Sequence, residues 1–459
     1  MQFETLFAPA REKPVVAALI GCGEFGMSLI AQSRRMEGLT IRAVADLDPE
    51  RVEASLRAAG YDVDLCDGRA AAEKAFTTDA IAICRSIDDL MALPIEIIVE
   101  ATGDSEAGAR FALAAIEAGH GVAMVSKEAE CVVGPILALK ARAKGVPYTL
   151  IDGDQPSLLI GLVSWARVLG LPIIAAGKSS EYDYVLDVVS GTVTWTDRKV
   201  SAPGLIDAWT LGTKAPDTVA QRARLLADLP HRTAPDYCEM CLVANATGLT
   251  PDRADFHALF TRTTELPDLY IPREDGGLLT RRGVLDVFNC LRRTDDPSFA
   301  GGVYVVVELA DEKTGQLFAG KGIPVSRNRR YALIYNPSHL LGVEAPISIV
   351  AAARLKHHMV DESYRPVCDM VAKAQTDLPA GHALEIVGAR HAMPGLEPLL
   401  VEAKPARGSN PLPYYMMVGR KLRRYVARGE FITADTVDPP ADSSLWSLRA
   451  EQDTLFWGA

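Results

Sequence analysis

Three glycines in the segment Gly21-Cys22-Gly23-Glu24-Phe25-Gly26 constrain the fold of this chain more than any other feature. The segment follows the apolar run Val15–Ile20 and leads into the amphipathic run Phe25–Arg34. In a strand–turn–helix unit, the first glycine permits a tight turn and the second lets the backbone approach a pyrophosphate. The third allows the helix to pack closely on the strand. Because the N-terminus of the helix presents free amide groups, the segment predicts a dinucleotide-binding turn.

Three further residues are expected to contact the nucleotide. Asp46 ends the second expected strand, 20 residues beyond the third glycine, where a carboxylate accepts a hydrogen bond from a ribose 2′-hydroxyl. That residue favours NAD and repels a 2′-phosphate, whereas nearby Arg51 offsets the preference, so the residues alone leave NAD and NADP open. Thr102 and Gly103 follow the expected strand Ile95–Glu100 and form a second candidate cofactor loop, with an ordinary strand-to-helix turn as the alternative.

The first 150 residues alternate short apolar runs with amphipathic ones, which predicts βαβ units and an α/β fold with a Rossmann-type, doubly wound parallel sheet. The expected strands are Val15–Ile20, Thr40–Ala45, Ile95–Glu100, Gly121–Val125 and Pro147–Ile151. The expected helices are Phe25–Arg34, Pro49–Ala59, Ser105–Ala118 and Cys131–Ala143.

Beyond this region helical and β-rich segments mix, which indicates an α+β second domain, and Pro405–Pro413 has the composition of a linker. We therefore expect a dinucleotide-binding domain over residues 1–151, a catalytic and dimerisation domain over residues 152–404 and a small C-terminal segment over residues 405–459. We also expect a homodimer.

The charge and the cysteine content exclude several classes of protein. With 48 Lys+Arg against 59 Asp+Glu the net charge is −11, so no global field attracts nucleic acid or an anionic membrane. An arginine and a proline interrupt the longest apolar stretch, Ser157–Gly177, which favours a buried helix and a strand over a membrane span. Eight scattered cysteines favour reduced thiols and a cytoplasmic location, and the lone pair Cys238 and Cys241 lacks the second pair that a zinc site needs.

Charged residues follow two expected strands at the sheet edge where ligands bind in open α/β folds. Lys127 comes directly after the strand 121–125 and could steady a substrate oxygen near a nicotinamide, by its charge or by donating a proton. The alternative is a solvated surface lysine. Asp152 and Asp154 follow the strand 147–151, and two carboxylates at this spacing can bind one Mg²⁺ or Mn²⁺. The alternative is a polar turn that caps the next helix.

A third polar group follows the expected strand Pro172–Ala175. Lys178 and Ser179 suit a phosphate or acid group on a substrate, and Glu181 could complete a metal site. Without a phosphate the same residues make an ordinary polar loop. Weaker candidates lie further along the chain, at Asn245, Arg329, Tyr335 and His339.

These motifs resemble one family. The chain resembles the nucleotide-binding half of the homoserine dehydrogenase superfamily in four segments, Gly21–Gly26, Ala45–Asp46, Glu100–Gly103 and Val125–Ala129. It resembles one branch of that superfamily in three further segments, Asp152–Gln155, Asn245–Gly248 and Asn336–Glu344. That branch ends in a SAF-like (β-clip) segment, here Leu412 to about Val437, and its best-characterised members are the DXR-like, type II 1-deoxy-D-xylulose 5-phosphate reductoisomerases of certain bacteria. The resemblance covers nearly the whole chain.

The resemblance implies an NADPH-dependent reaction, with NAD as the alternative, assisted by Mg²⁺ or Mn²⁺. A small phosphorylated sugar, 1-deoxy-D-xylulose 5-phosphate, would be rearranged and reduced to 2-C-methyl-D-erythritol 4-phosphate for isoprenoid biosynthesis. It implies that Asp152 and Asp154 bind the metal, that Lys127 polarises the substrate oxygens and that Lys178 with Ser179 binds the phosphate. The pair differs from the Asp-x-Glu of ordinary reductoisomerases.

Two alternatives stay open. One is a simple NAD(P)-dependent dehydrogenase of a small hydroxy acid or polyol, which needs the same cofactor turn but no isomerisation. The other is a catalytically silent NAD(P)-binding sensor or scaffold, against which the charged residues at the strand ends argue.

Overall fold

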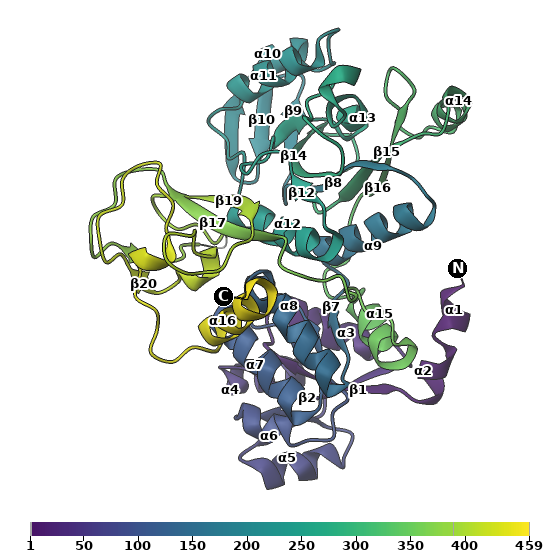
Figure 1. Ribbon diagram of the computed structural model, residues 1–459. Coiled ribbons are helices and arrows are strands. Elements are labelled where there is room, and N and C mark those ends of the chain that lie inside the picture. Colours follow the sequence, from purple (N-terminus) through teal and green to yellow (C-terminus); the bar gives the residue numbers. More distant parts are fainter. Residues whose placement is uncertain (1, 389, 459) are drawn as a thin grey trace.

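The computed structural model describes residues 2–388 and 390–458 (Figure 1). Within these residues seven parallel strands form the first sheet, in the order β3-β4-β2-β1-β5-β6-β7. The strands are β1 Val15–Ile20, β2 Leu39–Ala45, β3 Val63–Cys66, β4 Ile81–Cys84, β5 Ile97–Glu100, β6 Gly121–Met124 and β7 Tyr148–Leu150. The helices of this part are α1 Phe3–Leu6, α2 Ala8–Glu12, α3 Glu24–Ser33, α4 Pro49–Ala58, α5 Arg69–Phe76, α6 Ile87–Met91, α7 Ser105–Ala118 and α8 Lys127–Lys144. The predicted α/β fold with a doubly wound parallel sheet is confirmed.

Two strands of this sheet, β3 and β4, were not expected from the sequence. Each has four residues, and the structure identifies them by their pairing with each other and with β2. A second difference concerns α8, which begins at Lys127 and not at Cys131. Lys127 therefore lies in the first turn of a helix that starts at the carboxyl edge of the sheet.

In the described part of the chain a second, mixed sheet has nine strands. Its path is β11-β10-β9-β14-β8-β15-β16, with β12 and β13 also paired to β14. The strands are β8 Ile173–Ser179, β9 Tyr184–Asp187, β10 Thr192–Trp195, β11 Arg198–Ser201, β12 Thr250–Pro251, β13 Leu259–Thr261, β14 Val284–Arg293, β15 Val303–Glu308 and β16 Tyr331–Asn336. The helices are α9 Gln155–Val168, α10 Gly204–Asp207, α11 Ala215–Leu225, α12 Ala234–Thr247, α13 Leu266–Leu269, α14 Glu312–Gly320 and α15 Ala345–Val350. Helices α9 and α12 lie between this sheet and the first one (Figure 1).

Strand β8 runs further than the sequence indicated. It extends from Ile173 to Ser179, between β14 and β15, so Lys178 and Ser179 lie inside a sheet rather than in the expected loop. The close approach of the neighbouring strand requires a glycine just before them, because a Cβ on Gly177 would lie 1.8 Å from the carbonyl oxygen of Asp286.

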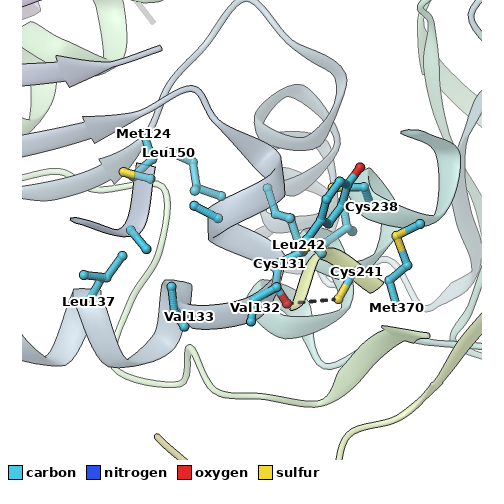
Figure 2. Packing of buried hydrophobic residues seen from close by; sticks show 14 of the residues in the cluster. Met124, Cys131, Val132, Val133, Leu137, Leu150, Cys238, Cys241, Leu242 and Met370 are labelled. Atoms are coloured by element: carbon cyan, nitrogen blue, oxygen red, sulfur yellow. Dashed lines mark hydrogen bonds between the residues drawn. The ribbon is translucent and has the colours of Figure 1, made fainter. Parts of the chain in front are cut away.

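A continuous buried core joins the first sheet, α8, α12 and the C-terminal β strands (Figure 2). Pro135 within α8 has no N–H group, so it leaves the carbonyl of Cys131 without its usual partner one turn later. The thiol of Cys241 on α12 donates to that oxygen across 3.7 Å. The helix break thus provides a polar contact between the two helices inside an apolar core.

The C-terminal β unit comprises β17 Cys368–Ala374, β18 Ala383–Leu384, β19 Leu396–Glu402 and β20 Arg420–Lys421. Strand β17 pairs with β19, and β18 pairs with β20. Isolated bridges also join Lys373 to Phe431 and Leu378 to Val426. The expected boundary between residues 404 and 405 therefore falls inside this hydrogen-bonded unit.

The last helix, α16 Ser444–Trp457, packs on α7 and α8 (Figure 1). The side chain of Gln452 enters the hydrogen-bond ladder of α8: its amide donates to the carbonyl of Val132 at 3.0 Å and accepts from the N–H of Ile136 at 3.2 Å. The chain end is thereby attached to the helix that starts at Lys127. No helix within residues 2–388 and 390–458 is long and apolar enough to cross a membrane.

Replacement of Arg449 by methionine should destabilise the protein strongly. Its guanidinium is 0% exposed and pairs with both carboxylate oxygens of Asp369, each at 2.7 Å, and with Asp453 at 2.7 Å. Methionine would leave buried carboxylates unpaired, so chemical denaturation should show a loss of about 3–5 kcal/mol in unfolding free energy. The control is Glu451→Gln on the same helix, which breaks a half-exposed pair with Lys140 and should cost less than about 1 kcal/mol. Equal losses in the two variants would contradict the expectation.

Candidate active site

The glycine turn has the geometry that nucleotide binding requires. Gly21 has φ +93°, and a Cβ there would lie 2.4 Å from the carbonyl oxygen of Ala101, so the loops after β1 and β5 touch. A Cβ on Gly26 would lie 2.5 Å from the carbonyl oxygen of Gly21, which shows how closely α3 packs on the turn. Gly23 has open space within 4 Å of the corresponding position. The middle glycine thus leaves room for a phosphate to approach the backbone.

Asp46 lies beside this turn, at the end of β2. Its Oδ2 accepts from the N–H of Cys22 at 2.7 Å, and its Oδ1 accepts from the N–H of Asp48 at 3.0 Å and from Arg51 at 3.1 Å. Partial burial opposes ionisation, but the N–H groups and Arg51 outweigh it and lower the pKa of Asp46. The ionised carboxylate borders a cavity of about 190 Å³ that Thr102 also lines. The cavity lies at the carboxyl ends of the strands, where this fold binds the adenosine half of a dinucleotide.

The loop after β5 is held by a buried acid that the sequence analysis did not single out. Oε1 of Glu100 accepts from the N–H of Thr102 at 2.9 Å and from its hydroxyl at 2.6 Å. Burial raises the pKa of Glu100. The N–H of Gly103 donates to the hydroxyl of Ser126 at 2.8 Å, which connects this loop to the residue before Lys127. The two predicted cofactor loops therefore meet at one edge of the sheet.

A buried network of charges lies next to these loops. Nζ of Lys127 donates to Oε1 of Glu239 at 2.6 Å and to Oδ2 of Asp154 at 3.0 Å. Nζ of Lys178 contacts the other oxygen of Glu239, and lies 3.0 Å from Oδ1 of Asp236. Glu239 thus bridges the two lysines. We call these five residues the lysine–carboxylate network.

The network draws on four elements. Lys127 starts α8 after β6, Asp154 precedes α9 after β7, and Lys178 lies in β8. Asp236 and Glu239 are three residues apart on α12, so both side chains project from one face of that helix. The network is open at one end only, because the Lys127 side chain is 24% exposed and that of Lys178 is 1% exposed.

The neighbours of Lys127, Lys178 and Glu239 hold these three groups in their charged forms. Burial alone would lower the pKa of Lys127, but Asp154 and Glu239 raise it well above its usual range. Glu239 and Asp236 likewise outweigh burial and raise the pKa of Lys178. Burial would raise the pKa of Glu239, but Lys127 and Lys178 lower it to about 2. Around neutral pH the open end therefore presents an ammonium group.

The two carboxylates predicted to bind a metal have different partners. Asp154 pairs with Lys127, whereas Asp152 lies near Glu344, and burial together with that second carboxylate raises the pKa of Asp152 to about 6. No three His, Cys, Asp or Glu side chains among the described residues are arranged to hold a metal ion. The donor set in this arrangement does not fit the Mg²⁺ or Mn²⁺ that the sequence suggested.

Four other predicted site residues lie outside the network. The hydroxyl of Ser179 donates to a backbone carbonyl at 2.5 Å, and Glu181 is exposed beyond the end of β8. Oδ1 of Asn245 accepts from two successive backbone N–H groups at the start of β17, at 2.7 and 2.9 Å. Asn245 thereby fixes the C-terminal β unit to α12. Nδ1 of His339 donates to the carbonyl of Gly301 at 2.9 Å.

The loop between β16 and α15 lies against the glycine turn. The hydroxyl of Ser28 on α3 donates to the carbonyl of Leu341 at 2.8 Å. Gly342 has φ +72°, and a Cβ there would lie 2.8 Å from the carbonyl oxygen of Phe25. Part of the motif Asn336–Glu344 therefore packs against the start of α3. This close contact explains why residue 342 is a glycine.

Asp236 and Glu239 were missed in the sequence. One signal could have indicated them: they are the two acids in an otherwise apolar or uncharged helix, Ala234–Thr247, where burial makes an unpaired carboxylate costly. The sequence does not show which cations they meet.

Two known families match consecutive parts of the chain. Residues 21–150 match the family described as "Homoserine dehydrogenase, NAD binding domain", and residues 153–345 match "Oxidoreductase DRL, catalytic domain". No curated protein matches the chain in sequence.

Several solved structures share part of the fold. The WlbA dehydrogenase from Bordetella pertussis in complex with NADH and UDP-GlcNAcA is 18% identical, with a TM-score of 0.28 over 37% of this chain and 47% of that chain. A DOX-P reductoisomerase structure with fosmidomycin and magnesium is 17% identical, with a TM-score of 0.27 over 36% and 46%. A probable dehydrogenase from Thermotoga maritima is 8% identical, with a TM-score of 0.36 over 75% and 90%. The chain spans about half the length of the first two, and at these TM-scores the likeness carries no functional argument.

The glycine turn and the two family matches lead to the same conclusion. The chain matches an NAD-binding domain of the homoserine dehydrogenase type over residues 21–150, followed by an oxidoreductase DRL catalytic domain over residues 153–345. It is an NAD(P)-dependent oxidoreductase.

Proposed function

We propose that this oxidoreductase reduces a carbonyl carbon of a small hydroxylated substrate, with Lys127 as the group that receives the developing charge on oxygen. The observation that carries the proposal is the position of the Lys127 ammonium. It follows β6, next to β5 and one strand further from β1, so it lies on the same sheet edge as the glycine turn and Thr102. Ligands in open α/β sheets bind along that edge.

When bound, the nicotinamide supplies the hydride to the carbonyl carbon. The carbonyl oxygen then gains the electron pair of the C=O bond, and Lys127 Nζ stabilises it and donates a proton. Asp154 and Glu239 hold the ammonium in place and keep it protonated in the free site. Because the Lys127 side chain is 24% exposed, the resulting amine can regain a proton from water.

The charge state of Lys127 suits the stabilisation of an anionic oxygen. A raised pKa means that the side chain enters the reaction as an ammonium, which can stabilise the negative charge that develops on the carbonyl oxygen. Lys178 has a different role. It is buried, and its charge neutralises Glu239 at the end of the network that is closed to solvent.

The second candidate is the reductoisomerase reaction, with NADPH and 1-deoxy-D-xylulose 5-phosphate. The match of residues 153–345 to the DRL catalytic domain supports it, together with the sequence resemblance of the loop 336–344 beside the cofactor turn. The need for a metal distinguishes this candidate from the first one. Among the described residues, the carboxylates of the site do not converge on one position that could hold a metal ion.

A substrate assay separates the two candidates. Purified protein should be given NADPH with either 1-deoxy-D-xylulose 5-phosphate or a panel of small hydroxy-aldehydes and hydroxy-ketones, with Mn²⁺ or with EDTA. Oxidation of NADPH only with the sugar phosphate, and only with Mn²⁺, would establish the reductoisomerase. Reduction of simpler carbonyl substrates that persists in EDTA would establish the metal-independent reductase. No turnover under any condition would contradict both.

Replacement of Lys127 by methionine should lower kcat by about 10²–10⁴-fold, the usual contribution of a positioned proton donor. Binding of the reduced cofactor, followed by its fluorescence, should change little because Lys127 is two strands away from the glycine turn. Lys140→Met on the same helix is the matched control, since Lys140 pairs with Glu451 of α16 far from the network, and it should retain wild-type kcat. A fully active Lys127→Met enzyme would contradict the assigned role.

The choice between NAD and NADP should depend on Asp46 and Arg51. Asp46→Ser removes the negative charge beside the cavity and should raise kcat/KM for NADPH relative to NADH by about tenfold or more, since each 1.4 kcal/mol changes the ratio tenfold. Arg51→Ala removes the compensating cation and should shift the ratio in the opposite direction. Steady-state kinetics with both cofactors measures the two changes, and shifts of the same sign would refute the expectation.

A further inference from the structure

One loop of the C-terminal β unit reaches both parts of the enzyme. It connects β18 to β19. The guanidinium of Arg390 lies over the ring of Trp195, in β10 of the second sheet, at 4.2 Å from the ring centroid. Its neighbour His391 faces the first turn of α8, with Nδ1 3.4 Å from Oε1 of Glu128. Two consecutive residues thus contact the catalytic part and the helix that carries Lys127.

The backbone of His391 is held in an unusual conformation. Its φ is +49°, in the left-handed region that residues with a Cβ seldom adopt. The hydroxyl of Tyr414 donates to the carbonyl of His391 at 2.8 Å, and the hydroxyl of Tyr415 lies 3.2 Å from its Nδ1. Strain of this kind persists where the surrounding contacts over-determine the conformation, and it is frequent at functional sites.

We propose that His391 is a positioning residue of the active site, which orients Lys127 by fixing Glu128 in the first turn of α8. The inference rests on the proposed function, since it concerns the residue that the reaction uses. It gives the C-terminal β unit a part in positioning the residue that acts on the substrate.

The pKa shifts of Glu128 and His391 agree with the close placement of both groups to Lys127. Burial raises the pKa of Glu128 to about 7, although Lys127 lowers it. Burial, and then the charge of Lys127, lower the pKa of His391. The titratable and charged groups around the imidazole are Glu128 and Lys127 of α8, the Tyr414 and Tyr415 hydroxyls, and Arg390. Above about pH 7 Glu128 therefore adds a negative charge beside Lys127.

Substitutions at position 391 can separate positioning from folding. His391→Gly relieves the backbone strain, so its thermal stability should equal or exceed that of the wild type. Its kcat should nevertheless fall by about tenfold to a hundredfold, because a small displacement of a catalytic group has effects of that size. The KM for the cofactor should stay unchanged. His391→Asn tolerates the left-handed backbone and keeps a polar group near Glu128 and Tyr415, so it should recover part of the lost kcat.

The matched control is His382→Asn, in the same β unit, whose backbone pairs with Pro379 and Leu422. It should have wild-type kinetics. A second readout is the pH profile of kcat, in which Glu128→Gln should remove an inflection near pH 7. Wild-type kcat in His391→Gly would overturn the proposal.

A titration independent of turnover distinguishes failure of this inference from failure of the proposed function. The imidazole of His391 is titrated by NMR in the wild type and in Lys127→Met. Loss of the positive charge should raise the pKa of His391. An unchanged pKa would overturn the inference whatever the activity. An upward shift in an enzyme that reduces no carbonyl substrate would instead place the fault with the proposed function.

Discussion

The bridge that Glu239 makes between Lys127 and Lys178 is the interaction on which the rest of the site depends. Burying a single charge costs several kcal/mol, and only close partners of opposite sign offset that cost. The bridge connects α12, β8 of the second sheet and the start of α8 at the edge of the first sheet. Because the pKa of Glu239 is about 2, these attractions persist across the neutral range. The network thereby connects the edge of the first sheet to the second sheet.

The two lysines of the network, Lys127 and Lys178, have different roles. Lys178 is enclosed by Glu239, Asp236 and Gln155, so its charge is used inside the protein and is not available to a substrate phosphate. Lys127 has the same bridging acid but opens to solvent at the cofactor edge. The buried lysine balances the shared carboxylate, and the exposed one can act on a ligand.

The C-terminal part of the chain supports this arrangement from the opposite side. Pro135 frees the carbonyl of Cys131 in α8 for the Cys241 thiol, and Gln452 contacts the next carbonyl, that of Val132. Both contacts secure the helix that Lys127 begins. The β unit that precedes α16 then supplies His391 beside Glu128, so the first half of α8 contacts parts of the chain that are distant in sequence.

Local patterns of the sequence determined the first sheet and the cofactor turn. The glycine spacing, the strand before it and Asp46 after it are all contained within about thirty residues, and the structure places them as predicted. The strands β3 and β4 were not predicted, and their place in the sheet is known only from their pairing with each other and with β2. Only the tertiary structure decided the site. Lys127 meets Glu239 across 112 residues and Lys178 meets it across 61, and no periodicity specifies such pairs. Asp152 and Asp154 look like a pair in sequence but face different partners, since the direction of a side chain after a strand depends on what packs around it.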